Sequence, residues 1–167
     1  MLDETPHSTI VLFALGERWW DTTHTFHFGF GEMTATPIDV QQLLGLDCDG
    51  EEIEVDRSLR VRPEAVYAAL GDVRRIVSGD SIRMSLLKDV LLSRVVDVED
   101  GLQVRQMARL FILLVLGGFM VASSDDVVHL LLLPYLRIFS NILLYDWGSL
   151  NLETLYFSLD AFSRCYR

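Results

Sequence analysis

The chain has 167 residues, of which 50% are apolar, and it carries a formal net charge of −10. This length and apolar content suit one domain with a single well-buried core. The negative charge disfavours sequence-independent binding to the phosphate backbone of DNA and favours a basic partner. The two cysteines, Cys48 and Cys165, lack the spacing of a disulfide framework or a zinc knuckle, so we expect a reducing compartment.

Neither a targeting segment nor a membrane-spanning helix is expected. The N-terminal MLDETPHSTI has acidic residues where a signal or transit peptide has basic ones. The uncharged stretch from residue 110 to residue 124 is shorter than the ~20 residues needed to cross a bilayer, so it predicts a buried helix.

The first quarter of the chain predicts a helix, a hairpin and a second helix. Residues 10–20 are apolar nearly all round, which is typical of a short, mostly buried helix. Residues 25–35 alternate apolar and polar side chains on either side of Gly29-Phe30-Gly31, which is typical of a hairpin. Thr36 before Pro37, with Asp39 three positions after the threonine, predicts a capped helix that ends at Gly45.

The remainder of the chain predicts mostly helix. Residues 51–56 alternate acidic and apolar side chains and predict one short strand, and residues 63–71 begin with proline and end with glycine, as a short helix does. Apolar spacings of three and four predict helices around residues 84–91, 104–114 and 152–162, and Pro134 is expected to separate two helical pieces. The predicted fold is therefore mainly α, a compact helical domain with one small N-terminal β-hairpin. The expected core contains Trp19, Phe26, Phe28, Leu43, Leu44, Phe111, Leu114 and Trp147.

His24 and His27 are the first candidates for a metal or catalytic site. On a strand, residues three apart point to opposite faces, so these two histidines cannot chelate one ion without a bulge. A metal site also needs three or four ligands, and only His7 and His129 remain as further histidines. We therefore expect no metal, and we interpret both histidines as structural.

Lys88, the only lysine, is the candidate for pyridoxal phosphate chemistry. It lies beside Asp89 on the polar side of a predicted helix, with no glycine-rich phosphate loop, so a solvated or ion-paired lysine and no cofactor are expected.

The acidic and aromatic clusters also predict structure rather than chemistry. Asp125 and Asp126 are interpreted as the N-terminal cap of an apolar helix, and Glu51, Glu52 and Glu54 as solvating groups. Trp147-Gly148-Ser149 predicts an aromatic helix junction, with Ser149 or Asn151 capping the last helix. The patterns GxSxG, GxxxxGK[ST] and HExxH are absent, so no catalytic residue is predicted.

Three segments resemble the plant mobile domain family: ALGERWWDTTHTFHFGFGEMTATPIDVQQLLGLDCDG, RLFILLVLGGFMVASSDDVVHLLLLPYL and YDWGSLNLETLY. They match the family's signatures in order, and the resemblance places His24, His27, Glu32 and Met33 in a fold-defining hairpin. It covers most of the chain, residues 1–167. The tract RIFSNILLYD is apolar where the family is usually polar and acidic, and the family domain commonly continues with further helices, which this chain is expected to lack.

The resemblance implies a helical domain carried by transposable elements and by host nuclear proteins that act in transposon silencing and genome stability. A non-enzymatic interaction domain with a nuclear location is the preferred interpretation. Its expected partner is a second copy or a serine/threonine phosphatase-like nuclear protein. The alternatives are an enzyme with an unrecognised site and a nucleic-acid-binding module. The name "aminotransferase-like" is also attached to the family, and the position of Lys88 gives it no support.

The tract from residue 137 to residue 162 holds more large apolar residues than one amphipathic face needs, which indicates a surface that a partner covers. The candidate protein-binding residues are Leu143, Tyr145, Tyr156 and Phe157, followed by Ile142 and Leu144.

Overall fold

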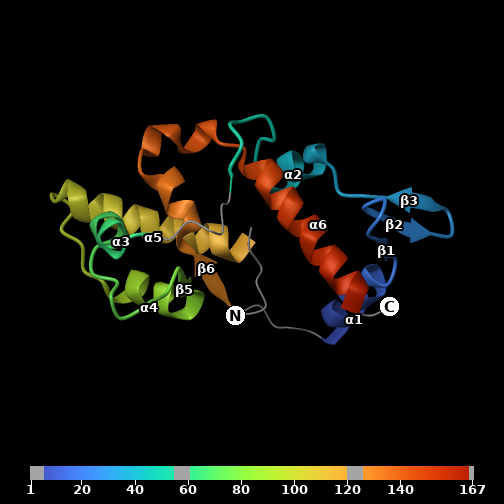
Figure 1. The fold of residues 1–167 in the computed structure, drawn as a ribbon, viewed down its shortest axis with the longest axis horizontal. Helices are drawn as coiled ribbons and strands as arrows, with labels where there is room; N and C mark the ends of the chain where they lie inside the picture. The colour runs from blue at the N-terminus through green and yellow to red at the C-terminus, as the bar shows by residue number, and fades with distance from the viewer. Residues whose placement is uncertain (1–5, 55–60, 120–125, 166–167) are drawn as a thin grey trace. The chain divides into compact units, whose positions relative to one another are not determined.

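The computed structural model of the chain describes residues 6–54, 61–119 and 126–165. It divides into two compact units. The terminal unit combines residues 1–49 with residues 147–167, and the central unit comprises residues 50–146. Figure 1 shows the helices and strands of both units in chain order.

The terminal unit consists of helices from both ends of the chain and one small sheet. Its elements are α1 (Pro6–Gly16), β1 (Trp19–Trp20), β2 (Thr25–Phe28), β3 (Gly31–Met33), α2 (Pro37–Leu44) and α6 (Trp147–Cys165). The three strands are antiparallel in the order β1-β2-β3, with Phe26 opposite both Trp19 and Met33. The predicted hairpin is confirmed, and Trp19 and Trp20 add a third strand to it.

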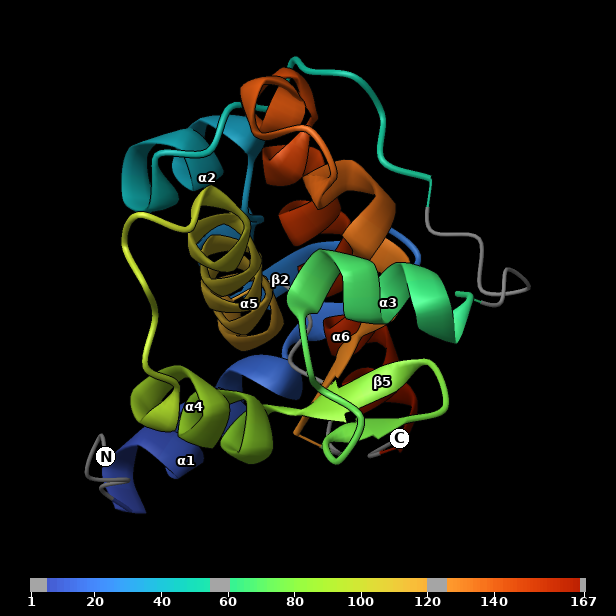
Figure 2. The same ribbon diagram turned by 90° about the vertical axis from the view of Figure 1, so that its left-hand side faces the viewer.

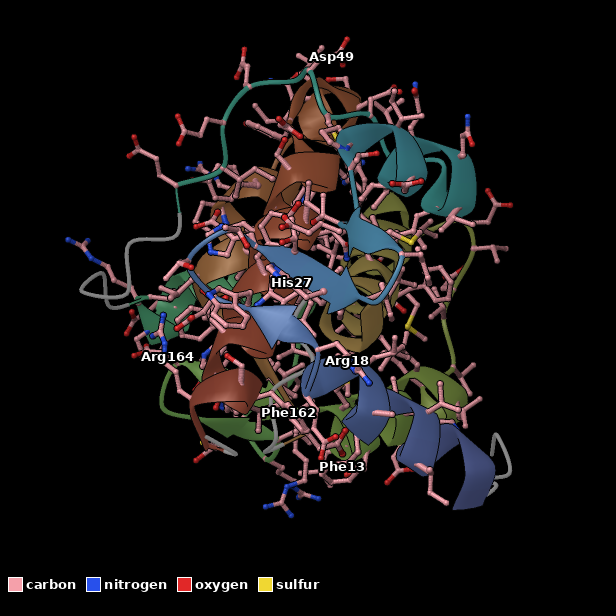
Figure 3. The ribbon with its side chains drawn as sticks, turned by 90° about the vertical axis from the view of Figure 1, so that its right-hand side faces the viewer. Phe13, Arg18, His27, Asp49, Phe162 and Arg164 are labelled. Carbon is pink, nitrogen blue, oxygen red and sulfur yellow. The ribbon has the colours of Figure 1, made fainter. Side chains whose placement is uncertain are left out.

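The first helix differs from the prediction. It ends at Gly16, so Trp19 and Trp20 lie in a strand, and Ile10 and Leu12 are 65% and 66% exposed. The helix packs on α6 through Phe13 and Phe162, whose ring centroids are 5.4 Å apart (Figure 3). A Cβ at Gly16 would lie 2.2 Å from the Phe162 ring, so this approach requires glycine.

The cap of α2 is confirmed in detail. The Thr36 hydroxyl accepts from the Asp39 N–H at 3.3 Å, and the Asp39 carboxylate accepts from the Thr36 N–H at 2.8 Å, which forms a capping box. Gly45 ends the helix at φ 69°, a left-handed conformation that suits glycine. The buried residue is Val40, whereas Leu43 and Leu44 are 82% and 43% exposed, so their predicted place in the core is wrong.

The last helix begins at Trp147, so the predicted caps Ser149 and Asn151 lie inside it and are wrong as caps. The Gly148 N–H donates to the Asp47 carbonyl at 3.0 Å. A Cβ at Gly148 would lie 2.4 Å from Cys48 Sγ, so glycine allows this close approach.

The central unit contains helices and a second sheet. Its elements are α3 (Pro63–Leu70), β4 (Val77–Ser78), β5 (Ser81–Arg83), α4 (Met84–Ser93), α5 (Gly101–Phe119), β6 (Val127–His129) and the 3-10 helices η1 (Leu130–Leu136) and η2 (Phe139–Leu144). Figure 2 shows α3, α4 and α5 with strand β5. The strands are antiparallel in the order β4-β5-β6, and buried Ile82 pairs with buried Val128. The sequence did not predict this sheet.

Helix α5 supplies much of the core of the central unit. Leu110 and Leu113 are fully buried and Leu116 is 8% exposed, whereas Phe111 is 58% exposed. The predicted burial of Phe111 is therefore wrong. Leu114 is half-buried, as Phe26 and Phe28 are in the first sheet, while Trp19 and Trp147 are buried as predicted.

Three smaller predictions for the central unit need correction. Asp126 has φ 53° and precedes a strand, so it does not cap a helix, and Asp125 lies outside the described residues. Pro134 lies inside η1, whose tight turns accommodate it, instead of separating two helices. Of the predicted strand 51–56, Glu51 forms an isolated bridge to Tyr145, and residues 55 and 56 lie outside the described residues.

The fold is thus mainly α with two small sheets, the first of which contains the predicted hairpin. Within the described ranges, no helix has the length and apolar character needed to cross a bilayer.

Candidate functional site

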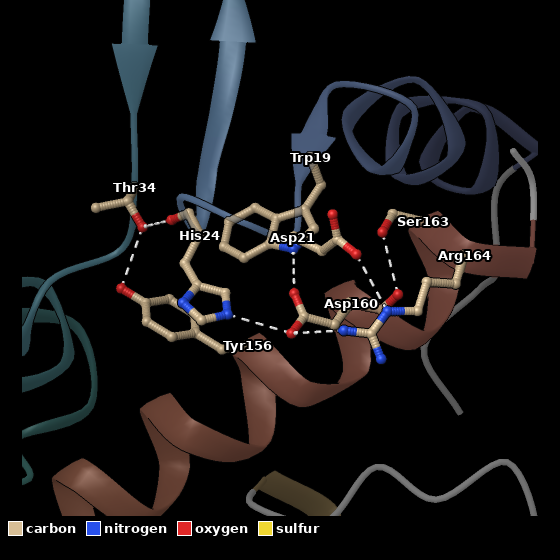
Figure 4. Close-up of polar contacts among 8 residues, drawn as sticks. All are labelled: Trp19, Asp21, His24, Thr34, Tyr156, Asp160, Ser163 and Arg164. Carbon is tan, nitrogen blue, oxygen red and sulfur yellow. Dashed lines mark hydrogen bonds and ion pairs between the residues drawn. The ribbon is translucent and has the colours of Figure 1, made fainter.

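The most elaborate polar cluster of the terminal unit lies where α6 packs against the first sheet (Figure 4). Its central group is the carboxylate of Asp160, which is 15% exposed. Oδ1 accepts from the indole Nε1 of Trp19 at 2.8 Å, and Oδ2 lies 3.2 Å from Nε2 of His24. Arg164 lies one helical turn further on, with Nη2 3.8 Å from Oδ2 of Asp160 and Nε 3.1 Å from Oδ2 of Asp21.

Tyr156 completes the cluster one helical turn before Asp160. Its hydroxyl donates to the Ala35 carbonyl at 2.6 Å and lies 3.1 Å from the Thr34 hydroxyl, which donates to the His24 carbonyl at 2.6 Å. The His24 and Tyr156 rings stack with centroids 5.2 Å apart. These contacts hold His24 at φ 52°, a conformation uncommon for a residue other than glycine.

An aspartate that orients a histidine can support general-base chemistry when the other ring nitrogen faces a hydroxyl or thiol. Within the described part of the chain, Nδ1 of His24 has no hydrogen bond, and the nearby Thr34 hydroxyl is occupied by the His24 carbonyl. The contacts of His24 therefore fit a structural role, in which its side chain helps to connect the first sheet to α6.

His27 makes separate contacts. It lies directly opposite Glu32 in the hairpin, with Nε2 3.8 Å from Oε1, and its ring stacks on Trp20. His24 and His27 thus face different carboxylates. In the ranges that the structure describes, no group of three or more His, Cys, Asp or Glu side chains could hold a metal ion.

The predicted protein-binding residues belong to both units. Leu143 is 90% exposed on η2 of the central unit, where Tyr145 is half-buried against the edge of the Tyr135 ring. Leu144 is also exposed and Ile142 is half-buried. In the terminal unit Phe157 is 63% exposed, and Tyr156 is held in the cluster around Asp160.

Sequence reasoning missed Asp21, Asp160 and Arg164. The available signal was the spacing Tyr156, Asp160, Arg164, which places three polar side chains on one face of a helix that is otherwise described by its apolar positions. Lys88, the rejected cofactor lysine, is exposed on α4.

Fold and cluster together define a mainly helical protein in which His24 connects the first sheet to α6. Residues 5–165 match the model of the plant mobile domain, and the chain belongs to this family. Three relatives from Arabidopsis thaliana are similar over most of the chain. They are the serine/threonine-protein phosphatase 7 long form homolog (33% identical over 87% of this chain), Protein MAIN-LIKE 2 (30% over 89%) and Protein MAINTENANCE OF MERISTEMS (28% over 87%).

The chain spans only 11% of the length of the phosphatase 7 homolog, 22% of MAIN-LIKE 2 and 31% of MAINTENANCE OF MERISTEMS. The shared region is therefore one part of much longer proteins. No solved structure matches the chain.

Proposed function

We propose that the chain is a non-enzymatic protein-interaction domain of plant nuclear regulators that act in transposon silencing and genome stability, or a transposon-encoded relative of such a domain. The partner is a second copy or a serine/threonine phosphatase-like nuclear protein. Family membership supports the biological setting, and one relative is named as a homolog of a serine/threonine-protein phosphatase.

The observation that carries the proposal is the exposure of large apolar side chains late in the chain. Leu143 is 90% exposed and its chain neighbour Leu144 is 52% exposed, and Phe157 is 63% exposed on α6. Clusters of exposed apolar side chains indicate protein contacts, and aromatic residues are frequent anchors of such contacts.

The two alternatives have less support. Nucleophilic catalysis with an oriented histidine as base needs a hydroxyl or thiol at its other ring nitrogen, and the paired His24 faces no such group among the described residues. A nucleic-acid-binding module is disfavoured by the net charge of −10.

Light scattering of the purified chain across a concentration series tests the self-association form of the proposal. We expect the mass to rise with concentration, and Leu143→Asp or Phe157→Asp to restore the monomer because a buried carboxylate opposes the contact. If wild type is a monomer throughout, the phosphatase-like protein must bind the chain, and the same substitutions must weaken that complex. A monomer that also fails to bind the phosphatase-like protein contradicts the proposal.

A further inference from the structure

A groove of about 570 Å³ lies in the central unit, between α3, α5 and η1. Its apolar lining includes the exposed Ala65, Ala68, Leu102 and Pro134, so the groove is open to solvent. Alanines on the α3 wall leave room that larger side chains would fill. Such an open groove suits side chains of another chain better than a fully enclosed small molecule.

Three arginines line the same groove: Arg105 and Arg109 of α5, and Arg137 just after η1. Among the residues that the structure describes, the groove lining includes no acidic side chain. Arg105 and Arg137 are exposed, and neither forms an ion pair among the described residues. Asp100, just before α5, accepts from the N–H groups of Leu102 and Gln103, and these bonds, together with a weaker Coulombic attraction to Arg105, lower its pKa.

Arg109 is fixed in place by the protein. Nε donates to the Leu136 carbonyl at 2.9 Å, Nη1 to Ala69 at 3.2 Å and Nη2 to Arg137 at 2.9 Å. These acceptors are neutral, so they orient the guanidinium without cancelling its charge. Arg105 lies one helical turn before Arg109, and two like charges at this spacing destabilise a helix. An anion in the groove would relieve this repulsion.

We propose that this groove binds an acidic segment of a partner protein, with one or two large apolar side chains against the alanines of α3 and carboxylates at Arg105 and Arg137. The apolar walls supply contact area, and the unpaired arginines supply the preference for negative charge. The groove contains none of Leu143, Tyr145, Tyr156 and Phe157, so it is a second interaction surface. Its test is independent of the proposed function.

A peptide segment fits the charge distribution better than a nucleic acid does. At physiological salt, charges act over about 8 Å, so a few carboxylates in the groove respond mainly to its arginines. A long polyphosphate backbone extends beyond the groove and meets the remainder of a chain whose net charge is −10.

The test begins with selection of a random peptide display library on the full chain, followed by affinity measurement on the variants. The first variant, Arg105→Glu with Arg137→Glu, reverses two charges of the lining and leaves the structural Arg109 intact. The second, Ala65→Trp, fills the groove without changing its charge. The control, Arg75→Glu with Lys88→Glu, makes the same change in charge at exposed positions of the central unit outside the groove. Thermal melting of each variant confirms that it folds.

We expect the selected peptides to combine acidic and large apolar residues. The double arginine variant and Ala65→Trp should each weaken binding about tenfold or more, and the control should change it less than about threefold. Failure to select any peptide, selection of peptides without acidic residues, or equal loss in the control would overturn the proposal. Binding of a DNA or RNA oligonucleotide that is stronger than that of the peptides and is lost in the arginine variant would also overturn it. If the selected peptides match this chain's own sequence, the partner is a second copy.

Discussion

The indole Nε1 of Trp19 lies 2.8 Å from Oδ1 of Asp160, although 141 positions separate the two residues. Trp19 is fully buried, and Asp160 also contacts His24 and Arg164. One carboxylate therefore joins the first sheet to the last helix, which explains how the two ends of the chain form one unit. It also explains how the His24 ring is oriented.

Replacing this carboxylate should destabilise the terminal unit. Asp160→Ala leaves the buried indole N–H of Trp19 without its acceptor, which costs about 1–3 kcal/mol of unfolding free energy. Asp160→Asn keeps an acceptor oxygen and should cost less. Urea denaturation monitored by tryptophan fluorescence measures both, with the exposed Glu153→Ala on the same helix as control. Equal stability of Asp160→Ala and the control would show that the bond does not hold the unit together.

The capping box of α2 gives a second prediction. Thr36→Ala removes the acceptor for the Asp39 N–H and should lower the free energy of unfolding by about 1 kcal/mol. Thr22→Ala, at an exposed position before the hairpin, is the matched control. Differential scanning calorimetry separates the two, and identical transitions would contradict the role of the cap.

The same cap predicts a dependence on pH. Hydrogen bonds from the Thr36 hydroxyl and then from its backbone N–H lower the pKa of Asp39 below its usual value. Because the folded-state pKa is depressed, this contribution to stability is present above the unfolded-state pKa of about 3.9 and is lost as pH falls through the lower folded-state value. Asp39→Asn should therefore lose less stability than wild type on acidification below about pH 4, as acid titration of the melting temperature would show. A steeper loss in Asp39→Asn would contradict the assignment.

Two adjacent residues of α5 provide a matched test of the core. Leu110 is fully buried, so Leu110→Ala should cost about 2–5 kcal/mol, whereas Phe111 is 58% exposed and Phe111→Ala should cost under about 1 kcal/mol. Chemical denaturation of both variants decides the orientation of the helix. The reverse order would restore the interpretation drawn from sequence alone.

Arg109 gives a prediction about how the central unit is held together. Its guanidinium donates to three carbonyls from two segments, and burial lowers its pKa. A lysine ammonium is a compact charge on a flexible side chain and cannot donate to all three carbonyls as the planar guanidinium does. Arg109→Lys should therefore lower the free energy of unfolding by about 1–3 kcal/mol. Arg105→Lys, which has no carbonyl partner in the described contacts, should be neutral in the same thermal melt. A neutral Arg109→Lys would contradict this role.

Local features of the fold were predictable from sequence, and features that depend on distant contacts were not. The hairpin and the Thr36 cap are determined by residues within a few positions of one another, so both can be predicted from the local sequence pattern. On α5 apolar residues surround much of the helix, so spacing alone did not distinguish Leu110 and Leu113 from Phe111. Strand β6 pairs with β5 from far along the chain, and strands of two or three residues are too short to show alternation.

The candidate site shows the same division. Sequence reasoning assigned His24, His27 and Glu32 to a structural hairpin. The structure places His27 and Glu32 there, whereas His24 lies in the turn between β1 and β2. It could not supply Asp160, because only the packing of α6 brings that carboxylate to Trp19. The sequence also could not predict that Arg105 and Arg137 line one groove, because they come together through the packing of α5 with η1.

The most direct test of the interaction function is quantitative capture from plant nuclear extract with the tagged chain. The variant Leu143→Asp with Phe157→Asp is compared with Ser140→Asp with Ser158→Asp, which adds the same charge at exposed positions in the same two elements. We predict that a second copy or a serine/threonine phosphatase-like protein is retained by wild type and by the serine variant and is reduced about tenfold or more with the apolar positions charged. Equal recovery of that protein with all three chains, or its absence from all of them, would contradict the account.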